Sequence, residues 1–153
     1  MPAHPMSEGE LLAFLQSEPP HTAVVSTVRT DGGPHVAPVW FALDTSAAGG
    51  DNPLGEIVFN TGTDTVKGKT LRRDPRVAIC IQDELRPYSF VTIDGVAALS
   101  DEPDELFRWA SLLGGRYMGA DRAEEFGRRN GVPGELIVRV RPLHIVALVD
   151  LAD

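Results

Sequence analysis

The sequence predicts a mainly β protein, a small antiparallel barrel with flanking helices. Six segments rich in β-branched and apolar residues are separated by turn signals, and the long crossover helices that parallel strands require are mostly missing. The length of 153 residues fits one domain with a single core. We therefore expect one domain over residues 1–153 and favour this barrel over a doubly wound sheet.

The first predicted elements are a short helix and a β-hairpin. Ser7 and Glu10 have the spacing of a capping box, and the apolar stripe that follows ends before two consecutive prolines. Residues 23–29 are rich in β-branched side chains. The Gly-rich turn at 30–34 leads into a second strand over 35–43, which completes the hairpin.

The middle of the chain is predicted to form an exposed loop and a third strand. Pro38 cannot donate to a β-ladder, so the second strand must have an edge or a bulge at that point. Residues 44–55 are rich in Gly, Ala, Ser and Asp, which indicates an exposed loop. The apolar run at 56–60 is the third strand.

A second helix and two further strands follow. The helix is expected over 65–73, and Pro75 stops it because proline disfavours a helical residue before it. Alternating or continuous apolar residues then predict strands at 76–82 and 88–98. Gly95 is expected to mark a bulge in the longer strand.

Two helices and a last strand complete the predicted fold. The acidic stretch 101–105 suits the positive N-terminal end of a helix, and apolar residues recur at helical spacing until 114–115. A second helix is expected over 120–130, with Gly131 as its cap. The apolar positions of 135–149 form the last strand region.

Charge singles out one window of the chain as a candidate binding site. The whole chain carries a formal net charge of −8, whereas residues 60–76 contain five basic and two acidic residues and carry +3. We expect an anion to bind there. On charge alone, a solvated basic helix with ordinary caps is the alternative.

The opening of this helix offers three ways of holding a phosphate. Thr61, Thr63 and Thr65 supply hydroxyls, Gly62 lets the backbone approach closely, and the helix start offers free N–H groups. The window lacks the Gly-x-x-x-x-Gly-Lys-Ser/Thr spacing, which excludes a nucleotide-triphosphatase loop.

Several classes of function are excluded or disfavoured by composition. No stretch approaches the roughly 20 apolar residues of a membrane helix, and residues 1–5 lack the pattern of a signal peptide. The single cysteine, Cys80, cannot make an internal disulfide. We therefore expect a cytoplasmic protein that binds no membrane. The negative charge argues against nucleic acid, and the four histidines form no metal-binding pair.

Ordered motifs in the chain resemble the split β-barrel flavin and deazaflavin oxidoreductases related to pyridoxamine 5'-phosphate oxidase. The matching segments are Val24 to Val28, Gly32 to Phe41, Thr65 to Val77 and Val91 to Ala97. The resemblance implies a six-stranded antiparallel barrel of the FMN-binding split-barrel type. It also implies a homodimer with two cofactors in clefts at the interface.

The resemblance assigns cofactor-binding roles to named residues. Lys67 and Lys69 would hold the cofactor phosphate, with Thr65 and either Asn60 or Thr61 bonding nearby. The backbone of Pro38, Val39 and Trp40 would face the ring system. The segment from Tyr88 to Phe90 would reach the same cleft, either from this chain or from the partner subunit.

The chain differs from pyridoxamine 5'-phosphate oxidase itself at several positions, and these differences change the activity that we expect. Thr65-Val66-Lys67 stands where pyridoxamine phosphate oxidase has Ser-Arg-Lys, which argues against oxidation of pyridoxamine phosphate. The run from Leu71 to Val77 and the Arg116-Tyr117 pair are more similar to the branch that uses coenzyme F-420. This branch implies hydride transfer from reduced F-420 to a conjugated small organic substrate.

Two alternatives keep the fold and change the function. One is an FMN-dependent oxidoreductase, and the other is a non-catalytic protein that carries a cofactor or tetrapyrrole. Because the cofactor performs the redox chemistry, no dedicated catalytic side chain is required. Tyr88, Tyr117 and Arg116 are the candidates for orienting the substrate or supplying a proton.

Overall fold

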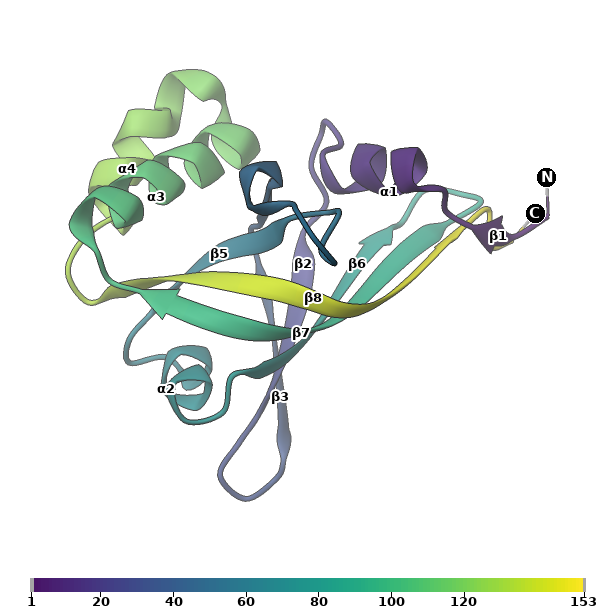
Figure 1. Cartoon of the computed structure of the whole chain (residues 1–153). Coiled ribbons are helices and arrows are strands. Elements are labelled where there is room, and N and C mark those ends of the chain that lie inside the picture. The colour runs from purple at the N-terminus through teal and green to yellow at the C-terminus, as the bar shows by residue number, and fades with distance from the viewer. Residues whose placement is uncertain (1, 153) are drawn as a thin grey trace.

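One curled antiparallel sheet dominates the computed structural model, which describes residues 2–152 (Figure 1). Its strands are β1 (His4–Pro5), β2 (Ala23–Val28), β3 (Pro34–Val39), β4 (Ala42–Asp44), β5 (Glu56–Gly62), β6 (Arg76–Asp83), β7 (Ser89–Ser100) and β8 (Glu135–Val149). The strand order is β3-β2-β6-β7-β8-β5-β4, and β1 pairs with β8. The two edge strands, β3 and β4, are joined by only two residues, so the two edges of the curled sheet lie close together and the sheet forms a split barrel. This confirms the predicted fold class.

The predicted strand over 35–43 is in fact two strands on opposite edges of the sheet. β3 pairs with β2, and β4 pairs with β5, so Trp40 and Phe41 carry the chain across the split. Pro38 therefore lies on an edge strand, as expected from its missing donor. This division and the two-residue β1 raise the strand count from six to eight.

The other predicted strands and the bulge are confirmed. Residues 76–82 fall in β6, the predicted strand 88–98 begins one residue later as β7, and the register between β7 and β8 shifts between Asp94 and Gly95. A Cβ atom at Gly95 would lie 2.6 Å from the carbonyl oxygen of Arg141. Glycine is therefore required there by the close approach of β8.

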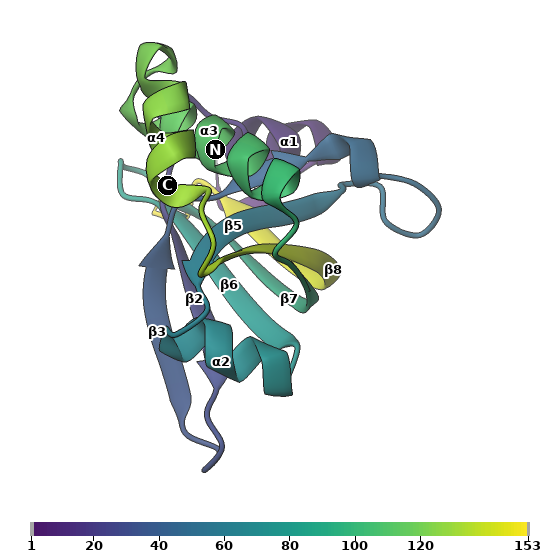
Figure 2. The same ribbon diagram turned by 90° about the vertical axis from the view of Figure 1, so that its left-hand side faces the viewer.

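The helices flank the barrel on different sides (Figure 2). They are α1 (Glu8–Leu15), α2 (Val66–Arg73), α3 (Pro103–Met118) and α4 (Ala123–Asn130), with single 3-10 turns at Thr45–Ala47 and Ala120–Arg122. The capping box of α1 and the Gly131 cap of α4 are confirmed. α3 continues past Gly114, where the sequence predicts its end, because Gly114 makes room for Phe126 of α4: a Cβ atom there would lie 2.2 Å from the Cβ of Phe126.

Two apolar clusters stabilise the fold. The larger one fills the barrel and includes Phe41, Ile57 and Phe59. The smaller one joins α3 to the outer face of β5 and β8 through residues such as Val58 and Trp109, and Trp40 packs against it. None of the helices within residues 2–152 combines the length and the apolar character that crossing a bilayer requires.

An ion-pair cluster holds α3 against the outer face of β5 and β8. Arg139 of β8 donates to Asp44 at 2.8 Å and to Glu105 of α3 at 3.0 Å. The hydrogen bonds from Arg139 lower the pKa of Glu105, although burial opposes the shift. α3 is therefore held at a fixed position above β5, which forms one wall of the candidate site.

Candidate functional site

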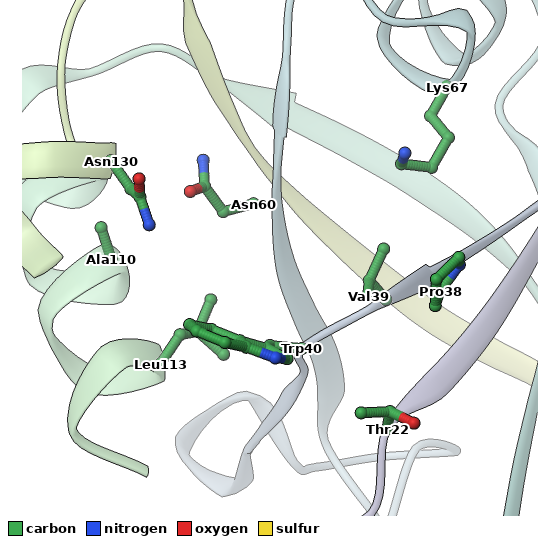
Figure 3. A pocket seen from close by; sticks show the side chains of 9 residues that line it. All are labelled: Thr22, Pro38, Val39, Trp40, Asn60, Lys67, Ala110, Leu113 and Asn130. Carbon is green, nitrogen blue, oxygen red and sulfur yellow. The ribbon is translucent and has the colours of Figure 1, made fainter. Parts of the chain in front are cut away.

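A cavity of about 340 Å³ opens where β3, β5, α2, α3 and α4 meet (Figure 3). Its volume falls at the lower end of the range for ligand pockets. Five predicted cofactor-binding residues line it, namely Pro38, Val39, Trp40, Asn60 and Lys67. The remaining lining residues are Thr22, Ala110, Leu113 and Asn130.

Lys67 supplies the positive charge of the cavity. Its side chain extends from the first turn of α2 into the lined space (Figure 3) and is half-buried. Burial lowers the pKa of this lysine, because the charged form loses hydration. Lys69, two residues further along α2, is exposed and does not line the cavity. The two predicted phosphate ligands are therefore not equivalent.

The hydroxyls of Thr61 and Thr65 at the helix opening make internal hydrogen bonds. Thr65 is the N-cap of α2, and its Oγ1 donates to the carbonyl of Gly62 at 2.9 Å and accepts from the N–H of Gly68 at 3.0 Å. Its third partner is the hydroxyl of buried Thr61, at 3.0 Å. A hydroxyl has one donor and two acceptor positions, so the hydroxyl of Thr65 is fully used. Direct contact of Thr61 or Thr65 with a ligand stays a prediction.

The backbone at the same helix opening offers further donors. The N–H groups of Gly68 and Lys69 bond to Thr65, whereas the geometry of a first helical turn leaves those of Val66 and Lys67 without an intrahelical acceptor. Together with the Lys67 ammonium group, they suit an anion such as a phosphate.

Trp40 forms an aromatic wall that is supported from behind. Its ring stacks on Tyr117 with the centroids 5.1 Å apart and nearly parallel planes, and Phe126 meets it edge-on at 5.7 Å. The hydroxyl of Tyr117 donates to the carbonyl of His21 at 2.6 Å and accepts from the N–H of Phe41 at 3.2 Å. These contacts fix the orientation of Trp40.

The two candidate catalytic residues on α3 make structural contacts. Tyr117 does not line the cavity, and burial raises the pKa of its hydroxyl. Arg116 donates to the carbonyl of Leu15 at 2.8 Å and also to the carbonyl of Phe41. Both side chains attach α3 to the barrel, and neither reaches the lined space.

Tyr88 and Phe90 lie away from this cavity. Tyr88 occupies a turn before β7 with a φ of 70° and an exposed fraction of 37%, and Phe90 is half-buried on β7. Neither lines the cavity within one chain. Their contribution from a partner subunit stays a prediction.

Four lining residues were not anticipated from the sequence. Ala110 and Leu113 belong to the apolar stripe of α3 and were indistinguishable from core residues, because a stripe does not reveal which member borders a cavity. Asn130 ends a predicted helix, and Thr22 precedes a predicted strand. No sequence signal set these two apart from ordinary caps and turns.

The protein is a split β-barrel, and its cleft is lined by Lys67 at a helix opening and by the aromatic ring of Trp40. Residues 7–147 match the family described as pyridoxamine 5'-phosphate oxidase. The chain belongs to this family. No curated protein matches the chain.

Three solved structures with the same fold show the range of proteins to which this chain is similar. A conserved hypothetical protein from Mycobacterium tuberculosis is 28% identical with a TM-score of 0.75, and the match covers 93% of this chain and 84% of that one. An F420 reductase is 25% identical with a TM-score of 0.64, covering 87% and 93%. The haem storage protein HutZ from Vibrio cholerae is 18% identical with a TM-score of 0.66, covering 92% and 94%, and shares the fold.

Proposed function

We propose that this protein is an oxidoreductase in which reduced coenzyme F-420 transfers hydride to a conjugated small organic substrate. The observation that carries the proposal is the layout of one cavity. A half-buried lysine at a helix opening lies on one side, and the Pro38–Trp40 wall lies along the other. This layout suits a planar ring attached to a phosphate. The similarity to an F420 reductase supports this choice of cofactor.

The protein would contribute binding, orientation and exclusion of water. When bound, the deazaflavin supplies the hydride chemistry. Lys67 and the free N–H groups of α2 would hold the phosphate, and the exposed basic residues of α2 suit the anionic tail. Trp40, Ala110 and Leu113 present apolar surface that keeps water from the ring. Among the residues that line the described cavity, Lys67 is the one charged side chain, and it is assigned to the phosphate. The proton for the substrate would therefore come from solvent or from Tyr88 of the partner subunit.

FMN is the second candidate cofactor, because its terminal phosphate suits the same helix opening. A tetrapyrrole carrier has less support. The residues that line the described cavity include no His, Cys, Met or Tyr that would ligate a haem iron. The fold shared with HutZ does not by itself support haem binding here.

Parallel fluorescence titrations with F-420 and FMN test the choice of cofactor. We expect tighter binding of F-420. Tight binding of FMN without any response to F-420 would reverse the ranking. Turnover of a conjugated acceptor with reduced F-420 then separates an enzyme from a carrier, since a carrier binds the cofactor and does not consume it.

We also propose that the protein is a homodimer. A row of uncharged residues crosses the outer face of four paired strands, from Val24 to Cys80, Thr92 and Val146. Val24 and Val146 are 40% and 38% exposed, which is unusual for an apolar sheet face in water. Pro38 of the cavity pairs with Val24, so a second copy seated on this face would border the cleft. Light scattering should give twice the chain mass, and a stable monomer would contradict the shared site.

A further inference from the structure

The side-chain amide of Asn60 has one possible orientation. Asn60 lies on β5, and its amide faces the carbonyl oxygen of Leu136 at 3.1 Å and the carboxylate Oε2 of Glu135 at 3.3 Å. Both neighbours accept hydrogen bonds, so the atom that faces them must be the NH₂ group. The Leu136 carbonyl and the Glu135 carboxylate restrain the amide together, and the Leu136 carbonyl does not titrate.

Asn60 consequently offers the cavity an acceptor and no donor. Its two N–H bonds point to Leu136 and Glu135, and its Oδ1 faces the side where Asn130 lies (Figure 3). A phosphate consists of acceptor oxygens and needs donors. The geometry thus disfavours Asn60 as a phosphate ligand, although the resemblance offers Asn60 or Thr61 for a hydrogen bond near the phosphate.

Glu135 contacts the Asn60 amide from outside the cavity, so it can position Asn60 without touching a ligand. It begins β8, is half-buried, and borders a second, smaller cavity of about 180 Å³ that does not include Asn60. Burial raises the pKa of Glu135, although the hydrogen bond from Asn60 opposes the shift. Glu135 does not line the cleft, and its carboxyl group acts on the cleft only by its hydrogen bond with Asn60.

The acceptor lies across the cavity from the cation. Figure 3 shows Asn60 and Asn130 on the α3–α4 side and Lys67 on the opposite side, with Pro38, Val39 and Trp40 in a row below them. A ligand whose phosphate meets Lys67 and whose ring follows this wall would place the far edge of the ring beside Asn60. In flavins and deazaflavins alike, the pyrimidinedione edge carries one N–H between two carbonyl groups.

We propose that Asn60, held in orientation by Glu135, accepts a hydrogen bond from the imide N–H of the cofactor ring. This inference rests on the proposed function and deepens it. Asn60 is then a specificity-determining residue that selects a ring with a donor at this edge, and Glu135 is a positioning residue.

The test compares two ligands that differ at the imide nitrogen. We would titrate the protein with 5-deaza-FMN, which has both the phosphate and the imide, and with its N3-methyl derivative. The unmodified protein should prefer the parent ligand by about tenfold, the value of one buried hydrogen bond. Asn60→Leu, which keeps the bulk and removes the acceptor, should bring the ratio close to one.

Two Glu135 variants separate positioning from general structure. Glu135→Gln retains an acceptor for the Asn60 amide and should keep the preference. Glu135→Leu leaves that amide less restrained and should reduce the preference, with parent-ligand affinity falling less than in Asn60→Leu.

The outcomes also separate this inference from the proposed function. Equal binding of the two ligands by the unmodified protein, or an unchanged ratio in Asn60→Leu, would overturn the role of Asn60. An unchanged ratio in Glu135→Leu would overturn the role of Glu135. If 5-deaza-FMN, FMN and F-420 all fail to bind, the proposed function itself is wrong.

Discussion

Replacing Lys67 by alanine should lower the affinity for F-420 or FMN about 10- to 100-fold, the value of one charge-assisted hydrogen bond. Lys67 lines the cavity and is half-buried, so its contact with a phosphate is poorly screened by water. Fluorescence titration measures the change. Since burial lowers the pKa of Lys67, affinity for the phosphate should also weaken with rising pH earlier than for an exposed lysine.

Lys69→Ala is the matched control for this prediction. Lys69 lies on the same helix and carries the same charge, but it is exposed and outside the cavity. We expect its replacement to change the affinity for FMN, which lacks the anionic tail of F-420, less than about threefold, because exposed charges contribute little through water. Equal losses in the two variants would mean that only the general positive field of α2 matters. No loss in either variant would exclude both lysine side chains as phosphate ligands.

Replacing Gly68 by alanine should lower the free energy of unfolding by about 3 kcal/mol and weaken cofactor binding as well. A Cβ atom at this position would lie 2.2 Å from the carbonyl oxygen of Gly62. Neither backbone segment can yield cheaply, because Gly62 ends β5 and Gly68 bonds to the N-cap Thr65. To admit the methyl group, α2 must move away from β5 and carry Lys67 with it.

Gly9→Ala provides the comparison for Gly68→Ala. Gly9 also lies within a helix, and nothing lies within 4 Å of a Cβ atom built on it. This change should stabilise the protein by about 0.5–1 kcal/mol through helix propensity. Urea unfolding measures both variants. If Gly68→Ala proves as stable as Gly9→Ala, the close packing of α2 on β5 is not maintained in solution.

Local patterns predicted most of the secondary structure. The bounds of α2 follow from the Thr65 cap and from Pro75, and the alternation in β6 follows from its single buried face. The strand over 35–43 was predicted as one piece because its sequence is continuous in β propensity. Its division depends on β2 and β5, which pair with its two halves on opposite edges and lie elsewhere in the sequence.

The sequence by itself determined the barrel class and the placement of a basic helix opening between β5 and β6. It did not distinguish Lys67 from Lys69, since two residues on a helix point in different directions and only packing decides which direction is the cavity. Nor did it determine the chemistry of Asn60. The Leu136 carbonyl and the Glu135 carboxylate fix that amide, and the antiparallel register of β5 with β8 brings them beside it. Such pairings join distant parts of the chain, so only the tertiary structure decided which lysine and which amide atom face this cleft.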